Sequence, residues 1–185
     1  MENFQFHHLR ASANHNRELV TALSGADLPV WGVFTGLFGM ATNEVYLVVT
    51  EDCDDAVVGL GFDVLRSEAW HPTARPTSPD RLNSPGLYVF RRFHIRQEDV
   101  AELVSLSEAA WETFEHGADY ASRPVGLFEP PGTNGEVPMQ LVTWYDGFES
   151  WEKSRTPAPQ ATENFRRRHT LTSTSYAVAT RLVTG

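Results

Sequence analysis

The second half of the chain repeats the order of predicted elements found in the first half, although the residues themselves have diverged. In each half a strand and a helix precede two strands that are joined through a turn segment, and a second helix follows. In the first half we expect a strand over 4–10, a helix over 16–23, strands over 30–38 and 44–51, a short helix over 54–60 and a strand over 63–70. In the second half we expect a strand over 87–95, a helix over 98–116, strands over 124–128 and 137–146, short helices near 148–151 and over 161–168, and a closing strand over 175–183. Repetition at this length predicts two copies of one small α+β module.

A proline-rich connector separates the two predicted modules. Residues 71–85 hold four of the eleven prolines among Thr, Ser and Arg residues, which is typical of an extended segment. We therefore place the first module at 1–82 and the second at 83–185. Two such modules supply about eight strands, and a sheet of that size tends to close on itself because closure removes its exposed edges. The nearly continuous apolar run 45–49 predicts a strand that is buried on both faces.

Composition limits the compartment and the class of partner. A chain of 185 residues can bury a substantial core, and Cys53, the single cysteine, cannot form an intramolecular disulfide. No secretory signal is visible at the N-terminus, and no apolar run approaches the roughly 18 residues of a membrane span, so we expect a cytoplasmic protein without a membrane partner. The net charge of -9 argues against nucleic-acid binding, because that binding depends on Lys and Arg contacts with phosphates. The one basic cluster, 166–169, is interpreted as a solvated face or as a carboxylate-binding surface.

Alternation along the two opening strands brings aromatic and basic residues onto equivalent faces. These faces carry Phe4, Phe6, His8 and Arg10 in the first half, and Tyr88, Phe90, Arg92 and His94 in the second. Such a set could line a pocket in which Arg10 or Arg92 binds an anionic oxygen and His8 or His94 transfers a proton. Three further strand aromatics could form its wall: Trp31, Tyr46 and Trp144. The alternative is that the aromatics fill the core and the basic residues reach solvent.

The sequence predicts no metal site and no cofactor. His7 and His8 are adjacent in a strand and therefore point to opposite faces, so they cannot easily bind one ion. The acidic run 51–55 lacks the glycine and glutamate positions of a calcium-binding loop, and acids that begin a helix have a simpler electrostatic explanation. A single histidine could serve as an axial haem ligand, which leaves haem as a less favoured alternative.

Three segments resemble those of NIPSNAP-like proteins, a group within the dimeric α/β-barrel superfamily of ferredoxin-like domains. They are the opening strand 6–10, the strand and Trp-bearing helix 141–151, and the segment 165–168 before the last strand. The resemblance implies two tandem ferredoxin-like modules whose antiparallel sheets pair within one chain and enclose a barrel. Relatives with this fold include monooxygenases, polyketide cyclases, isomerases of small aromatic compounds and haem-binding enzymes.

The resulting functional hypothesis is a NIPSNAP-like protein that binds or transforms a small hydrophobic or aromatic compound in a barrel pocket. A reaction there would be proton transfer or oxygenation without a cofactor. The alternative is a non-catalytic ligand carrier or protein-interaction module whose barrel is filled by its own side chains. Since the basic residues do not repeat strictly between the halves, we expect a single, asymmetric pocket. A homo-oligomer is compatible with the sequence, as are catalysis and simple ligand binding.

Overall fold

The eight strands of this α+β protein form one closed antiparallel barrel. The computed structural model describes residues 3–116, 119–132, 134–156 and 166–184. Around the barrel the strands follow the order β1-β3-β2-β8-β5-β7-β6-β4, and each neighbouring pair is antiparallel. The elements are β1 (Phe4–Arg10), α1 (Arg17–Gly25), β2 (Val30–Phe38), β3 (Glu44–Val49), α2 (Asp54–Gly59), β4 (Asp63–Pro72), β5 (Leu87–Arg96), the 3-10 turn η1 (Gln97–Asp99), α3 (Val100–Phe114), β6 (Ser122–Glu129), β7 (Glu136–Tyr145), α4 (Phe148–Lys153) and β8 (Thr172–Leu182). No described helix is long and apolar enough to cross a membrane.

The strand order is the same in the two halves of the barrel. Strands of the first half lie in the order β4-β1-β3-β2, and the corresponding strands of the second half lie in the order β8-β5-β7-β6. Pairing of β2 with β8 and of β4 with β6 joins the two halves and closes the sheet. The chain leaves β4 through residues 73–86, which run back along the barrel, where Leu82 donates a backbone hydrogen bond to Trp31.

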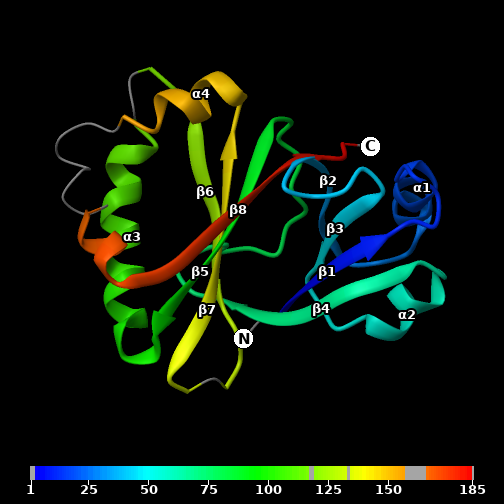
Figure 1. Ribbon diagram of the computed structural model, residues 1–185, viewed down its shortest axis with the longest axis horizontal. Helices are drawn as coiled ribbons and strands as arrows, with labels where there is room; N and C mark the ends of the chain where they lie inside the picture. The colour runs from blue at the N-terminus through cyan, green and yellow to red at the C-terminus, as the bar shows by residue number, and fades with distance from the viewer. Residues whose placement is uncertain (1–2, 117–118, 133, 157–165, 185) are drawn as a thin grey trace.

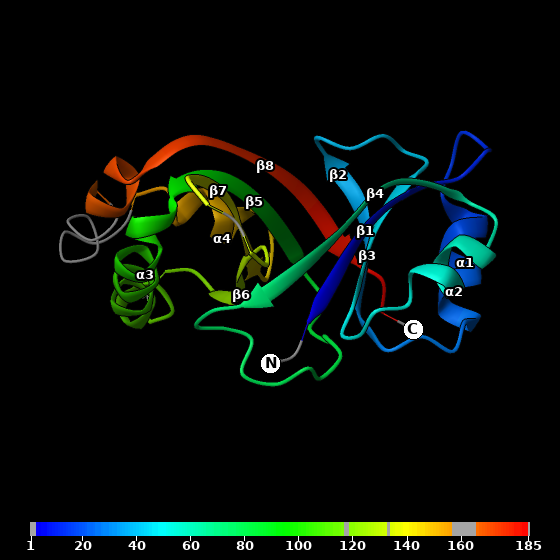
Figure 2. The ribbon, with the colours of Figure 1, turned by 90° about the horizontal axis from the view of Figure 1, so that it is seen from below.

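Helices cover the outer face of the barrel on two opposite sides. Figures 1 and 2 show α1 and α2 beside the strands of the first half and α3 beside those of the second. The first layer buries Leu19 and Leu23 of α1 against the strands, whereas α3 buries Leu103 and Trp111. The predicted long helix is therefore present, although its first residues form the separate turn η1.

Aromatic side chains fill the interior of the barrel. Phe34 is fully buried, and its ring centroid lies 4.8 Å from that of Phe90 and 5.3 Å from that of Tyr88. Phe4 contacts Trp31 edge to face at 5.5 Å. Contacts of this kind each contribute about 1 kcal/mol beyond the burial of apolar area, so the interior is a packed core. This packing favours the alternative that the sequence left open, a barrel filled by its own side chains, and a ligand pocket inside the barrel stays a prediction.

Candidate functional site

Five of the nine side chains that the sequence predicts for a ligand site meet at one end of the barrel. Phe6, His8, Tyr46, Phe90 and Arg92 all line one small cavity. They converge because alternate residues of each strand point into the closed barrel: His8 of β1 pairs directly with Tyr46 of β3, and Phe90 and Arg92 reach the same space from β5 on the opposite side. The cavity has a volume of about 40 Å³. That space suits one or two water molecules and no aromatic ligand.

The two basic side chains that the sequence predicts for this cavity, Arg92 and His8, already have partners. The two terminal nitrogens of Arg92 donate to the two carboxylate oxygens of Glu68 at 2.6 and 2.8 Å. Burial lowers the pKa of Arg92, but the hydrogen bonds and the charge of Glu68 more than offset this and leave that pKa raised. His8 Nε2 lies 2.9 Å from a carboxylate oxygen of Glu44. These two pairs leave neither basic group uncompensated for an incoming anion.

The other four predicted residues lie elsewhere. Arg10 is exposed and pairs with Asp63 at 3.0 Å, while Trp31 is buried in the barrel core. Trp144 packs against the same core from its edge. His94 is half-buried on β5 and lines neither this cavity nor the larger one described next. The structure therefore brings His8 close to Arg92, whereas it does not bring His8 and His94 into one pocket.

A much larger cavity, of about 610 Å³, lies outside the barrel between α3 and the outer face of β5, β7 and β8. Its position follows from alternation along β5, because Val89, Arg91 and Phe93 point outward while Phe90 and Arg92 point into the barrel. The lining residues that the structure describes are Val89, Arg91, Phe93, Trp111, Phe114, Pro124, Leu141, Thr143, Tyr145, Ser154, Arg155, Arg166, Arg168, His169, Thr172 and Ser175. Its size is that of a cavity for a drug-sized molecule.

Arginines and apolar side chains together give this cavity its character. Among the described lining residues there are four arginines and one histidine but no aspartate or glutamate. Arg91 donates to Ser175 Oγ at 3.3 Å, and Arg155 donates to the hydroxyl of Tyr145 at 3.2 Å. The guanidinium of Arg168 lies 5.3 Å from the ring centre of Phe93. Although the chain has a net charge of -9, the cavity therefore combines a concentrated positive charge with apolar lining residues such as Trp111, Phe114 and Leu141.

Two arginines of the cavity have a lowered pKa, because burial and the positive charge of a neighbouring arginine both disfavour the charged form. Burial and, to a smaller extent, the positive charge of Arg91 together lower the pKa of Arg168 to about 10. The pKa of Arg91 is itself lowered by burial and by the charge of Arg155. Among the described residues, the buried Nε of Arg168 has no hydrogen-bond partner. Burial and repulsion between the arginines both disfavour the charged guanidinium groups, and an anion bound between these groups would offset both costs.

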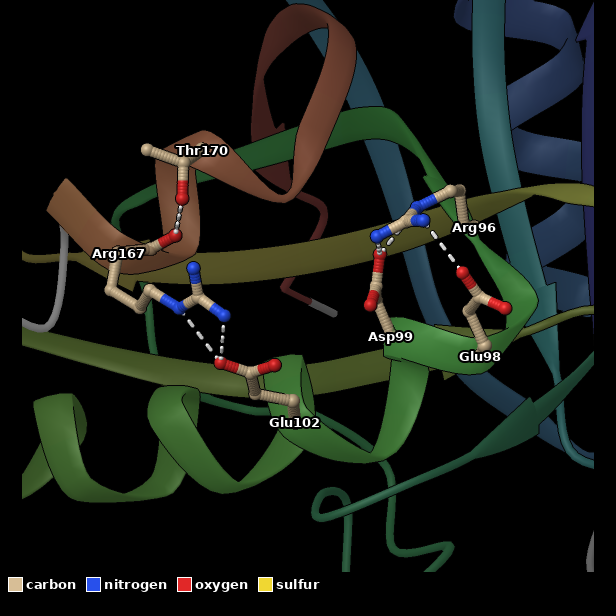
Figure 3. Close-up of polar contacts among 6 residues, drawn as sticks. All are labelled: Arg96, Glu98, Asp99, Glu102, Arg167 and Thr170. Atoms are coloured by element: carbon tan, nitrogen blue, oxygen red, sulfur yellow. Dashed lines mark hydrogen bonds and ion pairs between the residues drawn. The ribbon is translucent and has the colours of Figure 1, made fainter.

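A short basic turn, residues 166–170, delivers part of this charge. Figure 3 shows that Arg167 points toward Glu102 of α3, where its Nε and a terminal nitrogen contact one carboxylate oxygen at 2.8 and 2.7 Å. The hydroxyl of Thr170 donates to the carbonyl oxygen of Arg167 at 2.7 Å. Next to α3, Arg96 binds Asp99 and Glu98 of η1. The contacts of Arg167 hold one side of residues 166–170 against α3, while Arg166, Arg168 and His169 line the cavity.

The structure places the basic cluster partly on an exposed surface and partly in the lining of the cavity. Arg167 belongs to an exposed, solvated surface, whereas Arg166, Arg168 and His169 line the cavity. Of the helix predicted over 161–168, residues 161–165 lie outside the described residues, and 166–170 are helical. Sequence reasoning missed Arg91, although alternation along β5 could have identified it as an outward-facing arginine between Val89 and Phe93.

No cluster of three or more His, Cys, Asp or Glu side chains that could hold a metal ion occurs among the described residues. Cys53 is half-buried, and burial followed by the charges of Asp54 and Asp52 raises the pKa of its thiol. A thiol with a raised pKa is a weak nucleophile at neutral pH. Among the sites that the described residues form, the arginine-lined cavity is thus the one with both the volume and the hydrogen-bond donors to bind a small molecule.

Comparison with known proteins supports the fold. No protein-family model matches the chain, and no curated protein matches it. A ferredoxin-fold protein from Listeria monocytogenes, related to antibiotic biosynthesis monooxygenases, is 12% identical, with a TM-score of 0.59 over 100% of this chain and 97% of its own. An anthrone oxidase-like protein is 9% identical, with a TM-score of 0.61 over 98% and 91% of the two chains. A haem-binding protein from Thermus thermophilus is 12% identical, with a TM-score of 0.55 over 99% and 92%. Likeness at these identities concerns the ferredoxin-like α+β architecture alone.

Proposed function

We propose that this protein binds a small anionic molecule with an aromatic or otherwise apolar body in the cavity between α3 and β5, β7 and β8. One observation carries the proposal: four arginines and a floor of apolar side chains line the cavity, and its described lining contains no carboxylate. Arginine binds carboxylate, sulfonate and phosphate oxygens through paired N–H donors. Trp111, Phe114 and Leu141 would hold the apolar body of the ligand.

The barrel interior is a weaker candidate for the same function. Its aromatic side chains occupy the space that a ligand would need, and Arg92 is neutralised by Glu68. Proton transfer or oxygenation stays a prediction for any bound compound. For proton transfer, His169 replaces His8 and His94 as the proposed base, because it is the one imidazole among the described residues that line the cavity. The name of the anthrone oxidase-like neighbour is compatible with an aromatic ligand.

Two fluorescent probes separate anion binding from general hydrophobic binding. 8-Anilinonaphthalene-1-sulfonate and N-phenyl-1-naphthylamine have the same ring system, but only the first carries a sulfonate. We expect the sulfonate to bind more tightly at low ionic strength and to lose this advantage as salt screens the arginines. Replacing Arg91 by Gln is expected to weaken binding of the sulfonate about tenfold or more and to leave the neutral probe unchanged.

Arg181→Gln is the matched control, because Arg181 is an exposed residue of β8 that does not line the cavity. Its removal changes the net charge by the same amount. If Arg91→Gln and Arg181→Gln weaken the sulfonate equally, the attraction arises from overall charge and the proposed site is wrong. Equal affinity of wild-type protein for the two probes would contradict the proposal as well.

Haem is the second candidate ligand, and His169 is the observation that favours it. Its imidazole lines the cavity together with Arg91, Arg155 and Arg168, so these residues could provide an axial nitrogen and partners for two propionates. One of the structural neighbours is a haem-binding protein. Mixing the protein with haemin tests this candidate: a shifted Soret band that His169→Ala abolishes would support haem, and an unchanged spectrum would exclude it.

We also propose that the chain consists of two ferredoxin-like modules, 1–82 and 83–185. The common strand order of the two halves supports this division, and the narrower NIPSNAP-like assignment and a cytoplasmic location stay predictions. Pairing between β2 and β8 and between β4 and β6 would then act as the interface between modules. Co-expression of the two fragments tests the division: it predicts a complex that co-purifies, and insoluble fragments that never associate would contradict it.

A further inference from the structure

Among the described residues, several arginines pair with a carboxylate, whereas three that line the cavity do not. Six described arginines away from the cavity lie within 4.0 Å of a carboxylate: Arg10, Arg66, Arg75, Arg92, Arg96 and Arg167. Among the described residues, Arg91, Arg155 and Arg168 have no such partner. Their contacts are instead to hydroxyl groups and to aromatic rings. Arg17, Arg81, Arg123 and Arg181 also have no carboxylate partner among the described residues, but they are exposed and lie outside the cavity. The cavity group is distinguished because its arginines without a described carboxylate partner line one shared space.

The three charges are close enough to act on one another. Arg91 lies between the other two in electrostatic terms, because it perturbs Arg168 and is itself perturbed by Arg155. All three line the same cavity from different segments: β5, the residues after α4, and the basic turn. One negative charge would leave this group strongly positive, whereas two would come close to balancing it.

Hydroxyl groups beside the arginines can complete the coordination of an anion. The oxygen of Ser175 accepts a hydrogen bond from Arg91, and the oxygen of Tyr145 accepts one from Arg155. Each hydroxyl therefore keeps its own proton for donation to a further acceptor. Thr143 and Thr172 also line the cavity. A phosphate group, with three acceptor oxygens and a charge between -1.5 and -2 near pH 7, matches such a set of donors.

We propose that the ligand of this cavity carries a doubly negative headgroup and that a phosphate monoester with an aromatic or apolar body is the class it takes. This inference rests on the proposed function, since it specifies the headgroup of the anion bound there. Arg91 would contact the headgroup centrally, with Arg155 and Arg168 on either side. The apolar body would lie toward Trp111 and Leu141.

Calorimetric titration with two ligands of equal ring structure tests the inference. 1-Naphthyl phosphate carries two charges at pH 8, whereas 1-naphthalenesulfonate carries one at any pH. We expect the phosphate to bind wild-type protein about tenfold or more tightly than the sulfonate at pH 8. At pH 5 the phosphate has taken up its second proton, whose pKa is about 6, so the difference should largely disappear. Inorganic phosphate alone should bind more weakly than the naphthyl ester because it lacks the apolar body.

The outcomes distinguish failure of the headgroup from failure of the site. If both ligands bind equally at pH 8 and Arg91→Gln weakens both, the doubly negative headgroup is wrong while anion binding in the cavity stands. If neither binds, or if Arg91→Gln and Arg181→Gln affect both ligands alike, the proposed function fails as well. The comparison in wild-type protein decides the headgroup even if a variant folds poorly.

Discussion

Replacement of Arg168 by methionine is expected to stabilise the folded protein and, at the same time, to weaken its affinity for anionic aromatic ligands. The side chain lies over Phe93, its Nε has no partner among the described residues, and Arg91 adds a like charge. Methionine retains the length of the aliphatic stem and a favourable contact between sulfur and the ring, but it removes the charge. A residue that binds a ligand can lower the stability of the free protein, whereas a residue with a structural role is expected to raise it.

The magnitude follows from the perturbed pKa. A pKa lowered from 12.5 to about 10 corresponds to a cost of about 3 kcal/mol in the folded state. Partial solvent contact screens the charge, and the cation–π contact with Phe93 returns about 1 kcal/mol. We expect Arg168→Met to raise the free energy of unfolding by about 1 kcal/mol, which is about 2–4 °C in Tm for a chain of this size.

Urea unfolding followed by tryptophan fluorescence measures this change, and titration with 8-anilinonaphthalene-1-sulfonate measures the affinity of the same variant. Arg167→Met serves as control, because Arg167 is exposed on the neighbouring position and pairs with Glu102. The control is expected to change the free energy of unfolding by less than about 0.5 kcal/mol. If Arg168→Met destabilises the protein by more than about 1 kcal/mol and leaves probe affinity unchanged, Arg168 has a structural role and the reasoning is refuted.

Three further predictions concern other parts of the molecule. Burial lowers the pKa of His7 more than Asp54 and Asp52 raise it, so the unfolded chain binds a proton at this residue more readily than the folded protein. The free energy of unfolding should therefore be highest above about pH 6.5 and should decrease as the pH falls below that value. His7→Gln should flatten this dependence in urea unfolding at pH 5–8. Phe34→Ala should lower the free energy of unfolding by about 3–5 kcal/mol, since it opens a cavity in the barrel core, yet it should preserve probe affinity; a loss of probe binding in a folded variant would place the ligand in the barrel. Glu102→Gln removes the partner of Arg167 in an ion pair whose side chains are 42% and 53% exposed, so it should weaken probe binding only about twofold. The charge swap that combines Glu102→Arg with Arg167→Glu should restore probe affinity. A loss beyond tenfold in Glu102→Gln would show that the pair does more than position residues 166–170.

Elements with strong local patterns were predictable from the sequence. The apolar run of β3 correctly indicates burial on both faces, because Val48 packs into the barrel while Val45 and Leu47 pack against the α1 and α2 layer. Alternation also placed His8 and Arg92 on inward-facing positions, and closure of the barrel then brings them to one small cavity from β1 and β5 on opposite sides. Element boundaries moved by a few residues, as in β8, which begins at Thr172.

The main cavity was not predictable in the same way. Its walls come from β5, α3 and the residues after α4, so they are brought together only by the packing of distant segments. Arg155 lies just after a short helix and has no periodic pattern around it that indicates its role. The partner of each arginine is equally invisible in the sequence: Arg91 and Arg92 are adjacent, yet among the described residues only Arg92 meets a carboxylate, that of Glu68. The side of the strand on which each arginine emerges decides between neutralisation and exposure to a ligand.

The location of a bound anionic aromatic ligand is the most direct test of the central claim. A crystal structure of the protein with 8-anilinonaphthalene-1-sulfonate would show it. The arginine-lined cavity predicts the rings between Trp111 and Leu141 and the sulfonate against Arg91. Density for the probe beside His8 and Tyr46 at the end of the barrel would contradict the account, because it would assign ligand binding to the small cavity in which His8 and Arg92 already pair with carboxylates.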